Sequence, residues 1–178
     1  MHNTILLSSA LALALVLPAM AQEAGTAMAT FTDAAGTEVG SVTLTQGGDG
    51  VTISGMLEGM TPGEHGFHFH ETGDCDGASK FESAGKHFNP TAHKHGMENP
   101  GGPHAGDLPN VTADDTGMVM VELTSDTISL DEGDPAYVFD ADGTALVIHA
   151  AADDNVTDPS GNSGDRVACA VIEANTAP

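Results

Sequence analysis

The sequence has few positively charged side chains. Four Lys and Arg residues stand against 26 Asp and Glu, and the formal net charge is −22. Such a surface repels nucleic acid and anionic lipid, so we expect neither nucleic acid nor a membrane as a partner. The few cations are not scattered: Lys80, Lys86 and Lys94 fall among a group of histidines, and Arg166 lies just before Cys169. Their placement predicts a locally positive site on an otherwise acidic protein.

The sequence also lacks an apolar run long enough to cross a membrane, which takes about 20 residues. The run near the N-terminus, Ile5–Leu17, is shorter than that and is followed by Ala19-Met20-Ala21. Small residues at these positions fit the cleavage rule for a signal peptide. We therefore predict that residues 1–21 are removed after Ala21 and that residues 22–178 form a single periplasmic or secreted domain. Because no Lys or Arg precedes the apolar run, an uncleaved anchor is the alternative.

Only two cysteines are present, Cys75 and Cys169. Neither directly follows the predicted cleavage site, which argues against a lipid-anchored lipoprotein. In an oxidising compartment, an even pair of cysteines predicts a disulfide. Such a bond would close a long loop, and chain-entropy models give it roughly 4–5 kcal/mol of stabilisation. Two free buried thiols are the alternative.

Neither a sequence repeat nor a helical period of apolar residues is visible. Short runs rich in Val, Thr, Ile and Leu are instead separated by Gly, Asp and Pro, and several place apolar residues at every second position. This pattern predicts an all-β protein, an antiparallel sandwich or barrel. Hairpin turns are expected at 47–50 and 114–117. The expected strands are Ala27–Thr32, Glu38–Gln46, Val51–Leu57, Glu64–Glu71, Gly117–Leu123, Thr127–Leu130, Thr144–His149 and Arg166–Glu173.

Two segments, Gly73–Asn110 and Ala151–Asp165, break the strand pattern. Both are polar, and the first is rich in Gly, Pro and His. Ordinary domains seldom contain unstructured loops this long unless the loops are functional or held from outside. We expect metal ligands and the Cys75–Cys169 bond to hold the first loop. Both loops are therefore predicted to form walls of a functional site.

The histidines are arranged as metal ligands would be. His68 and His70 form an H-x-H pair, and in an extended strand both project from the same face about 6.5–7 Å apart. His149 ends an apolar run and could reach the same ion from a neighbouring strand. Imidazole nitrogens suit copper, so these residues predict a copper site. His65 falls on the opposite face and is expected to be a structural, hydrogen-bonded histidine.

A second set of donors lies in the first loop: His87, His95, His104 and Asp107. Three imidazoles and one carboxylate, all supplied by the protein, make the closed tetrahedral set typical of structural zinc. Zinc binding would then order the loop and would be coupled to folding. His93, by contrast, is expected to be exposed without a ligand role.

Taken together, these motifs resemble those of the copper–zinc superoxide dismutases of the exported bacterial type. The resemblance covers nearly all of residues 22–178 and rests on HGFHFHE, SAGKHFNP, KHG, PHAGDLPN, VIHAAADD and GNSGDRVACAVI. It implies an eight-stranded antiparallel Greek-key β-barrel or sandwich of immunoglobulin-like type, with two long functional loops. It also implies one copper and one zinc ion per subunit.

The resemblance further implies a role for each residue of the site. Arg166 would orient an anion at the channel mouth, His87 would bridge both ions as an imidazolate, and Asp153 would link a copper ligand to a zinc ligand through hydrogen bonds. The implied copper ligands are His68, His70, His87 and His149, and the implied zinc ligands are His87, His95, His104 and Asp107.

The implied activity is the dismutation of superoxide to dioxygen and hydrogen peroxide by alternating Cu(II) and Cu(I), in antioxidant defence outside the cytoplasm. One departure from the family concerns steering of the anion, because Val156–Asp165 lacks the lysines that many relatives have there; Lys86 and Lys94 could substitute. A non-catalytic metal-binding module is the competing function, against which the complete copper set and Arg166 argue. A plain structural sandwich is the third reading. Monomer and homodimer both stay open.

Overall fold

The computed structural model describes residues 25–175 of the chain, and this part contains strands, turns and loops but no α-helix. The only helical pieces of this part are two short 3₁₀ turns, and neither is long enough to span a membrane. The strands are β1 (Thr26–Asp33), β2 (Glu38–Gly47), β3 (Gly50–Leu57), β4 (Gly63–His65), β5 (Phe67–His70), β6 (Val111–Ala113), β7 (Val119–Ser125), β8 (Ala145–His149) and β9 (Arg166–Ala174).

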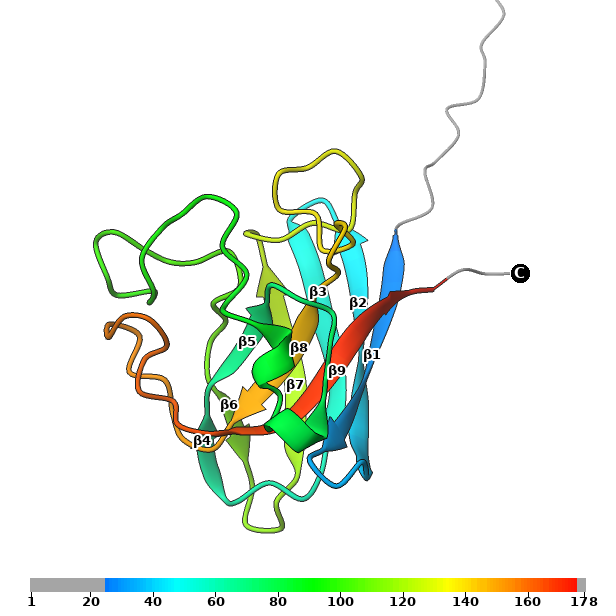
Figure 1. Cartoon of the computed structure of the whole chain (residues 1–178), viewed down its shortest axis with the longest axis vertical. Coiled ribbons are helices and arrows are strands. Elements are labelled where there is room, and N and C mark those ends of the chain that lie inside the picture. Colours follow the sequence, from blue (N-terminus) through cyan, green and yellow to red (C-terminus); the bar gives the residue numbers. More distant parts are fainter. Residues whose placement is uncertain (1–24, 176–178) are drawn as a thin grey trace, which may run out of the picture.

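All nine strands belong to one antiparallel sheet in the order β4-β6-β7-β3-β2-β1-β9-β8-β5. The two edge strands, β4 and β5, are separated along the chain only by Gly66, so the sheet curls into a nearly closed barrel (Figure 1). Gly66 joins this seam to the end of β8, because its carbonyl accepts a hydrogen bond from the His149 amide at 2.9 Å.

The prediction of an all-β antiparallel barrel is confirmed, but the sheet has nine strands rather than eight. The expected strand Glu64–Glu71 is interrupted at Gly66 and forms β4 and β5. At Gly66 an added Cβ would lie 2.8 Å from Ser163 Cβ, so only glycine fits where the chain turns across the seam. The short strand β6 was missed.

The expected strand Thr127–Leu130 is wrong, since this segment contains only an isolated bridge between Ser129 and Tyr137. Its polar groups find side-chain and loop partners instead of a ladder. The Thr127 hydroxyl donates to the Ala105 carbonyl at 2.8 Å, and the Leu130 amide donates to Gln46 Oε1 at 2.8 Å. Both expected hairpin turns are present, at 47–50 between β2 and β3 and at 114–117 between β6 and β7.

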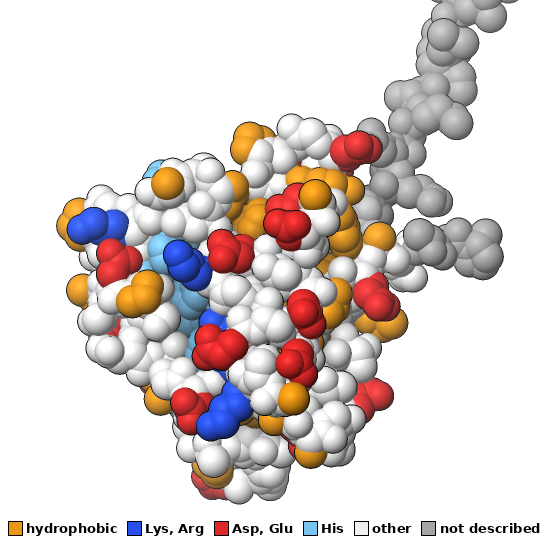
Figure 2. All heavy atoms as spheres, in the orientation of Figure 1, with side chains coloured by type: hydrophobic (Ala, Val, Ile, Leu, Met, Phe, Trp, Pro, Cys, Tyr) orange, Lys and Arg blue, Asp and Glu red, His pale blue; other side chains and the backbone are white. Residues whose placement is uncertain are grey.

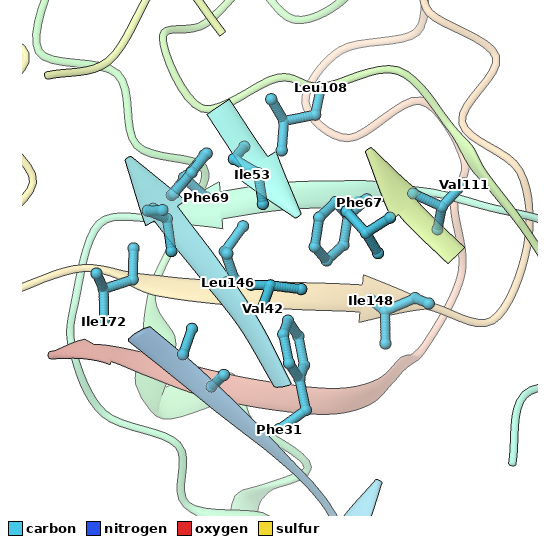
Figure 3. Packing of buried hydrophobic residues seen from close by; sticks show 14 of the residues in the cluster. Phe31, Val42, Ile53, Phe67, Phe69, Leu108, Val111, Leu146, Ile148 and Ile172 are labelled. Carbon is cyan, nitrogen blue, oxygen red and sulfur yellow. The ribbon is translucent and has the colours of Figure 1, made fainter. Parts of the chain in front are cut away.

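The barrel interior is filled by apolar side chains from every second position of the strands, as the period-two pattern predicts. Figure 3 shows Phe31, Phe67, Leu146 and Ile148 among the buried side chains that pack there. Phe31 and Phe67 are stacked with ring centroids 5.9 Å apart. This core gives β5 and β8 a fixed position, which matters because their other faces bear histidines.

The two long loops lie side by side on the outside of the barrel, near β5 and β8 (Figure 1). The first contains two 3₁₀ turns, η1 (Gly77–Ser79) and η2 (Glu82–Ala84). A disulfide joins Cys75 of this loop to Cys169 of β9 across a sequence separation of 94 residues, which confirms the predicted bond. The loops also contact each other directly, since the Glu98 amide donates to the Asn155 carbonyl at 3.1 Å.

Candidate metal centre

Strand β5 is buried on both faces, and the two faces differ in chemistry. Phe67 and Phe69 point into the barrel core, whereas His68 and His70 point outward and are covered by the loops, with 0% and 1% of their surface exposed. His149 ends the neighbouring strand β8, which pairs with β5. The alternation predicted from the H-x-H motif therefore places three imidazoles on the outer wall of the barrel.

The first loop supplies further donors by running alongside β5. Isolated bridges pair His70 with His87 and His68 with Asp107. Backbone hydrogen bonds fix this register, because the Phe69 amide donates to the Gly106 carbonyl at 2.9 Å and the Phe69 carbonyl accepts from the Phe88 amide at 2.8 Å. Short pieces of extended loop thus bring His87 and Asp107 beside the strand histidines.

Four of these histidines form the first cluster, which we call the copper group: His68, His70, His87 and His149. Their ligand nitrogens lie within 4.8 Å of one another, and all four residues are buried. One ring nitrogen of each has no hydrogen-bond partner: His68 Nδ1, His70 Nε2, His87 Nε2 and His149 Nε2. Burying an unpaired polar atom is costly, so four of them facing one point indicate a place for an ion. A site of four imidazole nitrogens fits copper.

The second ring nitrogen of each strand histidine is engaged, and this fixes which nitrogen faces the ion. His68 Nε2 donates to Asp153 Oδ2 at 2.6 Å, His70 Nδ1 to the Gly85 carbonyl at 3.0 Å, and His149 Nδ1 to the Gly164 carbonyl at 3.3 Å. Such outer hydrogen bonds set the tautomer and orientation of metal-ligating imidazoles. The copper group is therefore oriented before any ion binds.

The second cluster, which we call the zinc group, consists of His87, His95, His104 and Asp107, all buried and within 4.8 Å of one another. Asp107 Oδ1 lies 2.9 Å from His87 Nδ1, 3.0 Å from His95 Nδ1 and 3.3 Å from His104 Nδ1. Three imidazole nitrogens and one carboxylate oxygen around one point fit tetrahedral zinc.

The carboxylate of Asp107 is held for this role by its other oxygen. Oδ2 accepts hydrogen bonds from the backbone amides of Gly96 at 2.8 Å and His104 at 3.0 Å. Gly96 has φ +102°, and an added Cβ would lie 2.1 Å from the Asn155 carbonyl, so the close approach requires glycine. His87 is the one residue that the two groups share, with Nδ1 on the zinc side and Nε2 on the copper side.

Three imidazoles of the copper group, those of His70, His87 and His149, are held in the neutral form by lowered pKa values. Burial, reinforced by the neighbouring histidines, lowers the pKa of His87 to about 4 and that of His149 to about 3, and the pKa of His70 falls well below its usual value for the same reason. At neutral pH these rings are therefore unprotonated, so each has a lone pair available to an ion.

The pKa of His95 is shifted the other way. Burial is its largest single influence and lowers the pKa, but hydrogen bonds and charge interactions with Asp107 and Asp153 outweigh it and raise the pKa to about 9. Burial likewise raises the pKa values of Asp107 and Asp153, yet hydrogen bonds from the surrounding histidines bring both well below the usual range. Without an ion, a protonated His95 is thus paired with the carboxylates of Asp107 and Asp153.

Asp153 connects the two groups. Its Oδ2 accepts from His68 Nε2 at 2.6 Å and its Oδ1 accepts from His95 Nε2 at 3.0 Å, so one carboxylate links the residues to which the resemblance assigns copper and zinc. Two residues that no sequence pattern indicated hold Asp153 in place. Asn110 accepts from the Asp153 amide at 2.9 Å and donates to its carbonyl at 2.8 Å, while a Cβ at Gly161 would lie 1.7 Å from Asp153 Oδ1.

Arg166 begins β9 and is half-buried, with its guanidinium directed at the first loop. Nη2 donates to the Gly85 carbonyl at 2.6 Å, and Nη1 donates to the Phe81 carbonyl. The Gly85 carbonyl also accepts from His70 Nδ1, so one backbone oxygen contacts both the arginine and a histidine of the copper group. Burial lowers the pKa of Arg166, although a guanidinium stays charged at neutral pH.

The surface around these groups differs from the rest of this acidic protein. Figure 2 shows Lys and Arg side chains beside a strip of exposed histidine surface, with Asp and Glu spread over the neighbouring area. Lys80, Lys86 and Lys94 are exposed. The local concentration of cations agrees with the prediction from their positions in the sequence.

The remaining histidines of the described part lie outside both groups. His65 is buried, with Nδ1 2.6 Å from the His149 carbonyl and Nε2 2.7 Å from the Thr61 carbonyl, as expected of a structural histidine. His93 is exposed, as predicted. The predicted signal peptide, residues 1–21, lies outside the described residues.

Known proteins are similar to this chain in both sequence and fold. A model of the family described as copper/zinc superoxide dismutase (SODC) matches residues 38–172. Superoxide dismutase (Cu-Zn) 2 of Aquifex aeolicus (strain VF5) is 45% identical over 138 residues, which are 77% of this chain and 80% of that protein. Superoxide dismutase (Cu-Zn) of Caulobacter vibrioides is 45% identical over 141 residues, 78% of this chain and 80% of that protein. The crystal structure of a SOD-like protein from Bacillus subtilis superposes with a TM-score of 0.78 at 40% identity, covering 81% of this chain and 96% of the other.

Proposed function

This chain belongs to the copper/zinc superoxide dismutase family, and we propose that it dismutates superoxide to dioxygen and hydrogen peroxide outside the cytoplasm. The observation that carries the proposal is the pair of complete donor sets joined by His87, with Arg166 beside them. A protein that only stored metal would have no need for an arginine next to the copper group.

The chemistry divides between the ions and the chain. When bound, copper supplies the one-electron exchange with two successive superoxide anions, and zinc is redox-inert. His68, His70 and His149 would hold the ion through nitrogens that point outward from a rigid strand pair, and His87 would do so from the first loop. Arg166, half-buried and charged, attracts and orients the anion at the mouth of the site.

His87 has the second chemical role. Its Nδ1 faces the zinc group and its Nε2 faces the copper group, so the same ring contacts both sites. His87 Nε2 could hold one of the two protons that hydrogen peroxide requires, and the other would come from solvent. Asp107 Oδ1 lies 2.9 Å from His87 Nδ1 and keeps the ring in position, and a bound zinc ion would do the same.

The export proposal has two supports. Residues 1–21 have the pattern of a cleavable signal peptide. A disulfide such as Cys75–Cys169 persists in oxidising compartments and is rare in the cytosol. We therefore propose a periplasmic or secreted enzyme. N-terminal sequencing of the exported protein would test this, with Gln22 expected as the first residue.

The activity is tested by superoxide decay on protein reconstituted with copper and zinc, alongside metal analysis. We expect His149→Ala to lose nearly all activity because copper binding is crippled. Arg166→Ala should lose activity partially and keep its copper. His93→Ala is the matched control, since that histidine is exposed and outside both groups, and it should behave as wild type. Full activity in His149→Ala would refute the assignment, and copper binding without activity in the wild type would leave a metal-binding module.

A further inference from the structure

The guanidinium of Arg166 is held by backbone carbonyls rather than by a carboxylate. Within residues 25–175, every ion pair joins a histidine to Asp107 or Asp153, and none includes Arg166. Its direction is therefore set by the Phe81 and Gly85 carbonyls, which accept from Nη1 and Nη2. Whatever fixes these two oxygens also fixes the arginine.

Phe81 reaches its position with an unusual backbone. Its φ of 65° and ψ of 17° lie in the left-handed region, which a bulky side chain rarely adopts. A conformation of this kind persists only where the surrounding structure holds it, and such residues occur mainly at functional sites. Phe81 directly precedes η2, and its carbonyl accepts from the Ala84 amide at 3.1 Å as well as from Arg166.

The aromatic ring provides the restraint. It is completely buried in a small apolar cluster that is separate from the barrel core, which we call the disulfide cluster: Phe81, Ala84, Ala145, Val147 and Cys169, with Cys75 packed against them. In Figure 1 the two green turns of this loop lie against β8 and β9. Cys169 and Arg166 belong to the same strand, so the ring packs on the strand that bears the guanidinium.

We propose that Phe81 is a positioning residue for Arg166. The buried ring of Phe81 holds the left-handed backbone, and this backbone directs the Phe81 carbonyl at the guanidinium. The inference rests on the proposed function only in that Arg166 meets the anion. The other acceptor, the Gly85 carbonyl, has no side chain to hold it and also accepts a hydrogen bond from His70 of the copper group. The Phe81 carbonyl is thus the contact through which packing of the disulfide cluster orients the arginine independently of the copper group.

Two variants of the full chain separate the ring from the backbone. Phe81→Gly permits the positive φ without strain but removes the ring, whereas Phe81→Leu keeps an apolar side chain of similar reach. Arg166 is the only arginine in the sequence, so its ¹⁵Nε signal is assigned without ambiguity. In protein loaded with zinc but not with copper, we expect the Arg166 Nε order parameter to fall from roughly 0.85 to below about 0.6 in Phe81→Gly and to stay high in Phe81→Leu.

The metal-loaded protein gives a second readout, the affinity for azide measured by the change in the copper(II) spectrum. We expect azide to bind Phe81→Gly about five- to tenfold more weakly, and Phe81→Gly to cause no further loss in an Arg166→Ala background. Equal additional losses in both backgrounds would overturn the proposal. So would an unchanged Arg166 order parameter in a Phe81→Gly protein that is merely less heat-stable, because Phe81 would then serve packing alone.

A second pair of variants covers the case in which Phe81→Gly does not fold. Val147→Ala loosens the packing around the ring without altering residue 81, and Val121→Ala removes the same atoms from the barrel core. A lower Arg166 order parameter is expected in the first and not in the second, and equal values in both would overturn the proposal. The measurement on the copper-free, zinc-loaded protein does not depend on dismutation, so an inactive wild type would refute the proposed function without affecting this result.

Discussion

The copper group and the zinc group share a residue but are held by different parts of the molecule. His68, His70 and His149 project from β5 and β8, whose opposite faces are packed into the barrel core. The zinc group takes all its members from the 73–110 loop, which contains only two short 3₁₀ turns. The first set is positioned by hydrophobic packing and the second by its own polar contacts.

The difference has consequences for the order in which the centre forms. Strand histidines need no ion to reach their places, because Phe67, Phe69 and Ile148 anchor the same strands from inside. The loop does bury some apolar side chains, such as Phe81, Phe88 and Leu108. Its ligand residues, however, are held together by the polar contacts of Asp107, so we expect zinc to order them. Metal binding is therefore coupled to folding on the zinc side and much less on the copper side.

Among the variants that test this difference, removal of the Asp107 carboxylate should have the largest effect. We expect Asp107→Ala to lose zinc affinity by far more than the ~10–100-fold that loss of an outer-shell partner costs. Amide exchange should accelerate throughout 86–107, because both the ion and the two backbone hydrogen bonds to Oδ2 disappear. The measurement is zinc titration with hydrogen-exchange mass spectrometry.

The amides of β1, β2 and β3 are the internal reference, since these strands pair with one another in the sheet and supply no ligand to either group. They should stay protected in Asp107→Ala. His70→Ala is the matched variant on the copper side, expected to lose copper while the loop stays ordered. Equal loss of loop protection in the two variants would contradict a division between strand-held and loop-held ligands.

Asp153→Asn should act on both groups at once but more weakly. The carboxylate accepts from His68 on one side and His95 on the other, and an amide retains the shape while offering only one acceptor oxygen. We expect affinity for copper and for zinc to fall by about 10–100-fold each. Competition titrations with chelators measure both. A loss confined to one metal would show that Asp153 serves one group and does not link them.

Lowered and raised histidine pKa values should have opposite effects on how the stability of the protein depends on pH. In the metal-free protein, the lowered pKa values of His87 and His149 mean that the unfolded chain binds more protons below about pH 6.5, so stability falls as the pH drops toward 4. Linkage gives about 2 kcal/mol at pH 5 for one imidazole shifted from 6.5 to about 3. The raised pKa of His95 acts oppositely: its contribution is complete below pH 6.5 and is lost as the pH rises through about 9.

Metal-free protein should therefore be most stable near pH 6.5, as measured by denaturant unfolding at pH 5, 6.5 and 9. His149→Gln should flatten the acid limb, and His95→Gln the alkaline limb. Stability that keeps rising from pH 6.5 to 9 would show that His95 is not protonated in the folded protein.

The ligand residues could be predicted from the sequence because their chemistry is local. An H-x-H pair in an alternating run has to share one face of a strand, and closely spaced loop donors are within reach of one ion. The break at Gly66 and the three-residue strand β6 were beyond prediction, since so few residues show no period. The roles of Asn110 and Phe81 depend on contacts with segments far away in the chain, which no local pattern encodes.

The smallest expected effect concerns the cations, which repeat the same contrast. Arg166 belongs to a strand and is fixed by two carbonyls, whereas Lys86 and Lys94 are exposed loop residues. We expect Lys86→Gln and Lys94→Gln each to slow the reaction with superoxide by roughly two- to threefold at low salt, a small share of the ~10–10³-fold that steering can provide. The difference should vanish near 1 M salt, where the Debye length is about 3 Å. Glu122→Gln on β7 is the control, because it changes the net charge away from the site and should leave the rate unchanged. If it altered the rate as much as the lysine variants do, the total charge of the protein, and not the local placement of cations, would govern the encounter with superoxide.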